Sequence, residues 1–336
     1  MLNAMLAFLI CFAIALALGP LVIYWAKKTK SSQTILHYVE AHKAKDGTPT
    51  MGGIMFLLAL LLTSAIFLRE NSLLAVITIA TTLAYGILGF LDDFIKVKLK
   101  QNMGLRAYQK LIGQMGIAAI LAVFCYSSSL VGSTLYIPFT LIEFDIGFWI
   151  IPVIMFVFIA LTNSANLTDG LDGLAGSVSF VSILAFLAIT VLTVIGLPTS
   201  SGQALVAEYN NLILVCAAAA GGVMAFLCFN SHPAKIFMGD TGSLALGGLI
   251  ACIAVFTRQE LLLPFVCIAF VASAVSVIIQ VLHYKRTKKR VFLMAPLHHH
   301  FEKKGVNETK IVAIYIVVTV LVSVSTLTLL IAFGGG

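Results

Sequence analysis

Residues 174–196 read LAGSVSFVSILAFLAITVLTVIG, a run without a single charged side chain. The hydrocarbon core of a bilayer is about 30 Å thick, and a helix needs about 20 apolar residues to cross it. This run therefore predicts a membrane-spanning helix. Nine other stretches of the chain are similarly long and uncharged. The ten expected spans lie near residues 4–26, 51–68, 72–91, 111–128, 146–163, 174–196, 211–229, 241–257, 261–282 and 311–333.

The composition indicates an all-α polytopic membrane protein. Of the 336 residues, 60% are apolar and only 10% are charged, whereas a soluble domain is closer to half apolar and a quarter charged. This balance excludes an ordinary soluble globule, a disordered chain and a disulfide scaffold. The strand alternation of a transmembrane barrel is absent. The six cysteines lie in apolar stretches without metal-ligand spacing, so we expect them to be small core residues.

The distribution of basic residues predicts which side of the membrane each loop faces. Ten spans leave five breaks on one side and four on the other, and the first set holds 19 of the 21 lysines and arginines. Because cytoplasmic loops carry an excess of Lys and Arg, the first set is expected to be cytoplasmic and both termini outside. We expect one integral membrane domain over residues 1–336. The cytoplasmic breaks are 27–50, 92–110, 164–173, 230–240 and 283–310.

The segment DDFIK at 92–96 places two acidic residues and a lysine at the end of an expected span. On a helix, Asp92 and Lys96 lie four residues apart and share a face, while Asp93 points roughly 100° away. Adjacent acids at a membrane boundary pay a desolvation cost that a bound cation or a lysine would offset. The alternative is a helix end with one surface ion pair.

The segment NLTDGLDGLAG at 166–176 carries a polar side chain at every third position. Asn166, Asp169 and Asp172 would share one face of an α- or 3₁₀-helix. The interspersed glycines allow a ligand or a neighbouring helix to approach the backbone closely. The spacing differs from that of a calcium-binding EF-hand loop, which we reject. A polar turn followed by small-residue helix packing is the alternative.

A third motif, FNSHPAKIFMGDTGS, occupies residues 229–243. Asp240 directly precedes an expected span, where it could cap the helix. Capping alone leaves Asn230 and Lys235 unexplained. Because Asp is a hard oxygen ligand suited to Mg²⁺, Asp240 is also a candidate metal ligand.

Three consecutive histidines, His298, His299 and His300, follow a strongly basic stretch. Consecutive residues of a helix cannot all face one metal ion, so a zinc site is a poor interpretation. We expect the histidines to donate hydrogen bonds to phosphate or sugar groups. The basic stretch at 285–290 is mostly explained by cytoplasmic orientation and contact with lipid headgroups.

Taken together, these motifs closely resemble the phospho-N-acetylmuramoyl-pentapeptide-transferase family, within the polyprenyl-phosphate N-acetylhexosamine-1-phosphate transferase superfamily. Each segment is weak evidence alone, but five in order along nearly the whole chain are very specific. The matching segments are GTPTMGG at 47–53, DDFIK at 92–96, NLTDGLDGLA at 166–175, FNSHPAKIFMGDTGS at 229–243 and APLHHHFE at 295–302. The ten-helix topology of this family, with both ends outside, agrees with the charge distribution.

The resemblance implies an Mg²⁺-dependent reaction between two anionic substrates. UDP-N-acetylmuramoyl-pentapeptide and undecaprenyl phosphate would give lipid I and UMP at the cytoplasmic face of the bacterial inner membrane. A metal ion and lysines would neutralise the repulsion between the phosphates. Such phosphoryl transfer depends mainly on positioning and charge stabilisation. The implied partners are these two substrates and membrane lipid, not nucleic acid, and a homodimer is left open.

The resemblance also implies roles for individual residues. Asp240 would bind Mg²⁺, Asp92 would serve the lipid phosphate as base or nucleophile, and Asp93 would support metal or phosphate binding. The catalytic candidates are Asp92, Asp93, Asp240 and His298. The nucleoside-binding candidates are Asn166, Asp169, Gly170, Leu171 and Asp172, with Phe237 stacking on uracil. The polar cleft would be lined by Lys45, Lys96, Lys110, Asn230, His298, His299 and His300.

One position departs from the family pattern, which usually has Glu in the ninth span where this chain has Ser273. The departure concerns the groove more than the chemistry. Two other functions stay open. An N-acetylglucosamine-1-phosphate transferase of the same superfamily is disfavoured by the three histidines and the GTPTMGG segment. A multi-span transporter is disfavoured because it would bury ionisable groups near mid-bilayer, whereas the acids here lie at span ends.

Overall fold

The computed structural model describes residues 1–29, 47–99, 104–140, 142–197 and 202–333. Long helices dominate this part of the chain because its uncharged runs satisfy their backbone hydrogen bonds internally, as a bilayer requires. The longer helices are α1 (Leu2–Lys28), α2 (Gly53–Phe67), α3 (Leu73–Leu99), α4 (Ala107–Ser127), α5 (Ile150–Thr168), α6 (Leu174–Gly196), α7 (Gln203–Asn230), α8 (Gly239–Phe256), α10 (Ile268–Thr287) and α12 (Glu308–Phe333).

Short elements connect these helices. Strands β1 (Thr134–Tyr136) and β2 (Glu143–Asp145) form an antiparallel hairpin between α4 and α5, with Leu135 opposite Phe144. The remaining short helices are η2 (Gly147–Trp149), η3 (Glu260–Leu262), α9 (Leu263–Val266) and α11 (Leu297–Lys303).

Nine of the ten predicted spans each coincide with one apolar helix, and the ninth span covers both α9 and α10. Within the described residues, nine helices are long and apolar enough to cross a membrane, and α2, with 15 residues, is shorter. The helical class of the fold is therefore confirmed.

Helix α8 lies at the centre of the bundle, and all its residues except the half-buried Asp240 are buried. Small residues let its neighbours approach it closely. A Cβ atom added to Gly89 of α3 would lie 2.1 Å from the carbonyl oxygen of Asp240, and one added to Gly247 of α8 would lie 2.5 Å from Cα of Thr162 in α5. Because neither position has room for a side chain, α3 and α5 hold their backbones directly against the α8 backbone.

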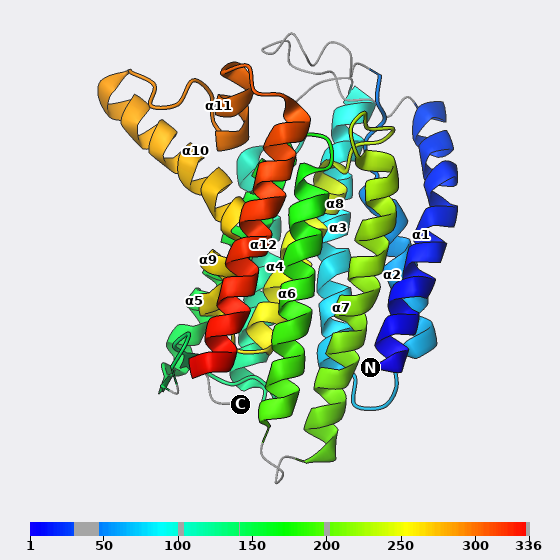
Figure 1. The fold of residues 1–336 in the computed structure, drawn as a ribbon, viewed down its shortest axis with the longest axis vertical. Coiled ribbons are helices and arrows are strands. Elements are labelled where there is room, and N and C mark those ends of the chain that lie inside the picture. Colours follow the sequence, from blue (N-terminus) through cyan, green and yellow to red (C-terminus); the bar gives the residue numbers. More distant parts are fainter. Residues whose placement is uncertain (30–46, 100–103, 141, 198–201, 334–336) are drawn as a thin grey trace.

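Two predicted spans have different bounds in the structure. The third continues beyond residue 91 to Leu99, so Asp92, Asp93 and Lys96 lie inside α3 rather than at its end. The ninth is not one continuous helix, because the backbone leaves helical geometry at Cys267, between α9 and α10. Beyond this break α10 slopes away from the bundle and carries α11 with it (Figure 1).

Both chain ends lie at the same end of the bundle, together with the β1–β2 hairpin (Figure 1). The loops that follow α5 and α7 lie at the opposite end, where α11 also lies. The segments that carry the polar motifs therefore gather at one end of the molecule.

Candidate active site

The carboxylate of Asp240, in the first turn of α8, is the centre of a cluster of charged side chains. Its Oδ2 atom lies 3.0 Å from Nζ of Lys96 and 2.7 Å from Nζ of Lys110. Its Oδ1 atom accepts a hydrogen bond of 2.7 Å from Nδ2 of Asn166, which also donates to Oγ of Ser243 at 2.9 Å. Helices α3, α4 and α5 thus each supply one side chain to Asp240. All three side chains, those of Lys96, Lys110 and Asn166, were predicted as site residues from the sequence.

Asp92 lies beside Asp240 and shares its lysines. Its Oδ2 atom is 2.7 Å from Nζ of Lys96 and 3.9 Å from Nζ of Lys110. The first of these contacts confirms the predicted pairing of residues four apart on one helix. The backbone N–H of Leu105 donates to Oδ1 of Asp92 at 2.6 Å. Asp92 is buried, and its negative charge is therefore matched by both lysines and by a backbone donor.

Asp93 points away from Asp92, as the helical geometry predicted, and binds the start of α8. Its Oδ2 atom accepts hydrogen bonds from the backbone N–H of Thr241 at 2.9 Å and from the Thr241 hydroxyl at 2.7 Å. Its Oδ1 atom accepts from the backbone N–H of Asp240 at 3.2 Å. The cap of α8 is therefore a side chain of α3. Asp240 does not cap its own helix, which frees its carboxylate for the lysines.

The residues of this cluster fit a hard divalent cation. Oxygen atoms of Asp92 and Asp240 face the same two ammonium groups, so they converge on one region. Carboxylate oxygens are ligands that Mg²⁺ prefers. The lysines supply the positive charge in this structure, and a cation binding to Asp240 would have to share or displace it.

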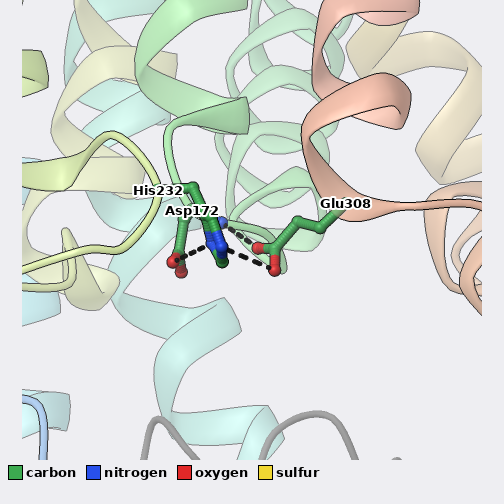
Figure 2. A group of neighbouring side chains, drawn as sticks. All are labelled: Asp172, His232 and Glu308. Atoms are coloured by element: carbon green, nitrogen blue, oxygen red, sulfur yellow. Dashed lines mark hydrogen bonds and ion pairs between the residues drawn. The ribbon is translucent and has the colours of Figure 1, made fainter.

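A second cluster joins Asp172, His232 and Glu308 (Figure 2). Nδ1 of His232 lies 3.0 Å from Oδ2 of Asp172 and 3.5 Å from Oε2 of Glu308. The backbone N–H of Asp172 donates to Oε1 of Glu308 at 2.7 Å. One ligand atom from each residue lies within 4.8 Å of the others, so the group could also hold a metal ion. Glu308, in the first turn of α12, was not predicted from the sequence, because no motif surrounds it.

The predicted strip of Asn166, Asp169 and Asp172 on one helical face is wrong. Helix α5 ends at Thr168, and the chain turns before α6 begins at Leu174. Asn166 consequently faces Asp240 while Asp172 faces His232. Asn166 therefore belongs to the Asp240 cluster and Asp172 to the His232 cluster, so the three side chains do not form one continuous surface.

Asp169 lies in the turn between these clusters. Burial, followed by the negative charges of Asp240 and Asp93, raises the pKa of Asp169 to about 8. The carboxyl group is therefore mostly protonated at neutral pH and can donate a hydrogen bond. The neighbouring Leu171 is buried, and its side chain packs in the apolar core.

Asn230 ties the loops together and does not line an open cleft. It is buried, its Oδ1 atom accepts a hydrogen bond of 3.0 Å from the backbone N–H of Gly173, and its Nδ2 atom donates to the Ile236 carbonyl at 2.9 Å. The half-buried Phe237 lies in the same loop, and its backbone pairs with Pro49 and Gly52. This pairing places the described part of the GTPTMGG segment beside the third motif.

The three histidines point in different directions, as expected for neighbours on one helix. His298 is fully buried, and a Cβ atom added to Gly170 would lie 2.3 Å from its Nε2 atom. His299 contacts Glu302 through Nδ1 at 2.5 Å. Nδ1 of His300 accepts a hydrogen bond from the backbone N–H of Leu293 at 3.1 Å, which ties α11 to the preceding loop.

Among the predicted site residues, His298 therefore lies against the 169–172 turn, whereas His300 holds α11 to the preceding loop. The predicted Lys45 lies outside the described residues. Ser243 was missed, although its spacing of three residues from Asp240 on a helix could have revealed it.

The comparisons with known proteins place this polytopic helical chain among the glycosyl transferases. A family model described as glycosyl transferase family 4 matches residues 73–258, which include every helix from α3 to α8. The signature of phospho-N-acetylmuramoyl-pentapeptide-transferase matches residues 45–57.

Similar proteins with that name occur in several bacteria. The protein of Desulfitobacterium hafniense is 44% identical over 312 residues, which cover 92% of each chain. The protein of Clostridioides difficile is 42% identical over 94% of each chain, and that of Thermoanaerobacter sp. is 44% identical over 95% of this chain and 96% of its own. The chain belongs to the phospho-N-acetylmuramoyl-pentapeptide-transferase family.

Proposed function

We propose that this protein transfers phospho-N-acetylmuramoyl-pentapeptide from UDP-N-acetylmuramoyl-pentapeptide to undecaprenyl phosphate. An oxygen of the lipid phosphate attacks the sugar-linked phosphorus, the phosphoanhydride bond breaks, and UMP leaves with its bonding electrons. The product is undecaprenyl-diphospho-N-acetylmuramoyl-pentapeptide, lipid I. The observation that carries this proposal is the family signature in a chain whose relatives of that name are 41–44% identical over most of its length.

The arrangement around Asp240 supports a reaction between two anionic phosphates. Lys96 and Lys110 hold their ammonium groups within 3.0 Å of one carboxylate oxygen, in a part-buried site where charge interactions are stronger than in water. When an incoming phosphate approaches, these ammonium groups can turn toward it. Asp92 contacts the same two lysines. It is the proposed partner of the lipid phosphate, as base or nucleophile.

Asp240 and Asp92 are the residues that would hold Mg²⁺. The ion would supply positive charge to the transferring phosphoryl group and to the departing UMP phosphate. Asp93 acts in the same proposal through the fold, because its bonds to the start of α8 hold Asp240 in place.

The nucleotide is proposed to lie over the 169–172 turn. Asp172 is oriented there by the N–H of Ala234, at 3.1 Å from its Oδ2 atom, and by His232. The protonated Asp169 offers a donor to a carbonyl oxygen of a base. His298 lies against Gly170 and supports the 169–172 turn by this contact.

The membrane arrangement is proposed as ten spans, with both termini outside and the active site at the cytoplasmic face of the bacterial inner membrane. The 19-to-2 split of basic residues supports this orientation. Both termini lie at the end of the bundle opposite the polar motifs, as this orientation requires (Figure 1). A single domain over 1–336 belongs to the same proposal.

The test uses detergent-purified full-length protein with undecaprenyl phosphate, Mg²⁺ and a panel of UDP-sugars. UMP release and the mass of the lipid product are measured. We expect UMP release and a lipid I mass with UDP-N-acetylmuramoyl-pentapeptide only. A product formed from UDP-N-acetylglucosamine instead would favour the other superfamily activity and overturn the proposal.

The metal assignment is tested in the same assay. Chelation of Mg²⁺ is expected to stop UMP release, and Asp240→Asn, which removes the charge but keeps the size, is expected to abolish the response to added Mg²⁺. His232→Ala should leave that response unchanged. If instead His232→Ala removes the response and Asp240→Asn preserves it, the ion binds at the Asp172 cluster.

A further inference from the structure

A buried polar group lies beneath the Asp240 cluster and is not used by the proposed chemistry. We name it the amide node; it consists of Tyr85 on α3, Gln114 on α4 and Asn163 on α5. The Gln114 and Asn163 side chains face each other: Nδ2 of Asn163 donates to Oε1 of Gln114 at 2.9 Å, and Nε2 of Gln114 donates to Oδ1 of Asn163 at 3.4 Å. The Tyr85 hydroxyl donates to the backbone carbonyl of Gln114 at 3.2 Å.

Two of the three side chains of the amide node are enclosed by the bundle, and the third, Asn163, is half-buried. Gln114 and Tyr85 are almost fully buried, with 1% and 0% of their surface exposed. The Tyr85 ring stacks on Phe158 of α5 at a centroid distance of 6.1 Å. A Cβ atom added to Gly248 of α8 would lie 2.5 Å from that ring. The node therefore joins α3, α4 and α5, the three helices that supply side chains to Asp240, and lies against α8, which carries Asp240.

Helical spacing links the amide node to the site. Gln114 lies one turn beyond Lys110 on the same face of α4, and Asn163 lies three residues before Asn166 on α5. Both Lys110 and Asn166 reach Asp240 at 2.7 Å, on its two different oxygen atoms. A shift of α4 or α5 along its axis would move one of these contacts out of hydrogen-bond range.

A reciprocal amide pair is well suited to prevent such a shift. Each amide has a donor and an acceptor in fixed positions, so a pair forms both bonds at one relative height only, whereas apolar side chains can slide past each other. Asn163 is itself anchored, because its Nδ2 atom also donates to the Ile159 carbonyl at 2.7 Å.

We propose that Tyr85, Gln114 and Asn163 are positioning residues that set the height of α4 and α5, so that Lys110 and Asn166 meet Asp240 in reactive geometry. The inference rests on the proposed function, since its main readout is the transferase reaction. The activity of the wild type in the lipid I assay separates a failure of the proposed function from a failure of this inference. An inactive wild type with all UDP-sugars contradicts the proposed function, whereas the inference is judged by variants of an active wild type.

The experiment compares Gln114→Met, Asn163→Leu and the double variant. Gln114→Met leaves the half-buried amide of Asn163 without its partner, and Asn163→Leu leaves the buried amide of Gln114 without its partner. Both changes lower stability, and replacement of both partners by apolar groups of similar shape restores much of it. Thermal midpoint, kcat and KM for the UDP-sugar are measured. Because misplacement by about 1 Å can cost up to 100-fold, we expect kcat to fall about 10-fold or more in both singles. KM for the UDP-sugar should stay within about twofold, because the nucleotide lies over the 169–172 turn.

The double variant distinguishes a role in positioning the reactive side chains from a role in stability alone. We expect it to regain the wild-type thermal midpoint while kcat stays about 10-fold reduced. A double variant that recovers kcat together with its thermal midpoint would overturn the proposal.

Tyr209→Phe is the matched control, because Tyr209 is also buried and its hydroxyl also donates to a helix carbonyl, that of Phe256 at 3.3 Å. It should lower the thermal midpoint without changing kcat. If the amide variants do not fold, Tyr85→Phe is compared with Tyr209→Phe in the same way, and equal kcat in these two variants also overturns the proposal.

Discussion

Single residues at the site owe their geometry to charge compensation. Asp92 and Asp240 bring two carboxylates together in a part-buried place, where their repulsion would be costly without Lys96 and Lys110. The same ammonium groups are the donors that incoming phosphates require. The same lysines therefore stabilise the two carboxylates and prepare the site for anionic substrates.

Loss of Lys96 is expected to abolish most of the turnover. Lys96→Met removes the ammonium group that contacts Asp92 and Asp240, and kcat should fall about 100-fold, as when an oriented donor to developing charge is deleted. Lys98→Met is the control, because Lys98 is on the same helix but lies over the Phe94 ring. Kinetics of UMP release check this, and equal activity of the two variants would exclude a role for Lys96.

Asp172 and Asp92 are expected to affect different steps. Asp172→Asn should raise KM for the UDP-sugar, since this carboxylate contributes to ground-state binding of the nucleotide. Asp92→Asn should lower kcat and leave nucleotide binding nearly unchanged, because Asp92 acts on the lipid phosphate. Calorimetric titration of the UDP-sugar into each variant measures the difference. Equal weakening of binding by both changes would refute the division of roles.

At the scale of helices, side chains of one helix repeatedly cap the end of another. Asp93 of α3 caps the start of α8, and Glu208 of α7 caps the start of α3 through the N–H groups of Leu73, at 3.1 Å, and Leu74, at 2.9 Å. The first N–H groups of a helix lack partners within it, so a negative side chain there is stabilising. These caps fix the relative heights of α3, α7 and α8.

Removal of the cap on α3 is expected to lower stability without affecting the chemistry. Glu208→Ala leaves two backbone N–H groups without their acceptor, and we expect a loss of about 1–3 kcal/mol. The thermal midpoint of the purified protein measures it. The exposed Glu70 provides the control, since Glu70→Ala removes a carboxylate from the same turn and should change the midpoint little. A midpoint unaffected by Glu208→Ala would show that the cap is energetically unimportant.

For the whole molecule, the position of charge along the chain supports the proposed orientation. The basic residues gather in the breaks that also carry the acidic motifs, and the opposite breaks hold only Arg69 and Arg258. In the proposed orientation, the active site would receive a soluble nucleotide sugar from the cytoplasm while the apolar bundle stays in contact with lipid.

The orientation predicts the labelling pattern of introduced cysteines. In a Cys228→Ser background, which removes the exposed native thiol, a cysteine at Thr140 should react with a membrane-impermeant reagent in intact cells. A cysteine at Lys303 should react only after the cells are opened. The opposite pattern would reverse the topology.

Stability of the whole molecule is expected to fall as pH rises through the range where Glu260 ionises. Burial raises the pKa of Glu260 from 4.5 to about 8, and its own backbone N–H and Arg258 oppose this only in part. Between these values the folded protein holds a proton that the unfolded chain releases, so the free energy of unfolding decreases with rising pH.

Glu260→Gln removes this titration, and its thermal midpoint should vary less between pH 5 and pH 9 and exceed that of the wild type at the alkaline end. The exposed Glu143 supplies the control, because Glu143→Gln should leave the pH dependence unchanged. Parallel curves for the wild type and Glu260→Gln would mean that Glu260 does not titrate as described.

Local physics explains how much could be predicted from the sequence alone. Length and lack of charge define each membrane helix within its own residues, and the four-residue spacing places Lys96 beside Asp92 on one helix. The sidedness of the basic breaks is likewise a property of composition. These features required no knowledge of how the helices meet.

The tertiary structure alone decided which distant residues meet. Asn166 and Asp240 are 74 residues apart, and they meet because Gly89 and Gly247 let α3 and α5 lie against α8. The end of α5 at Thr168 separated side chains that periodicity had grouped together, and α12 brought Glu308 to Asp172. Helix periodicity says which residues share a face, whereas the side-chain volumes between helices determine which faces come into contact.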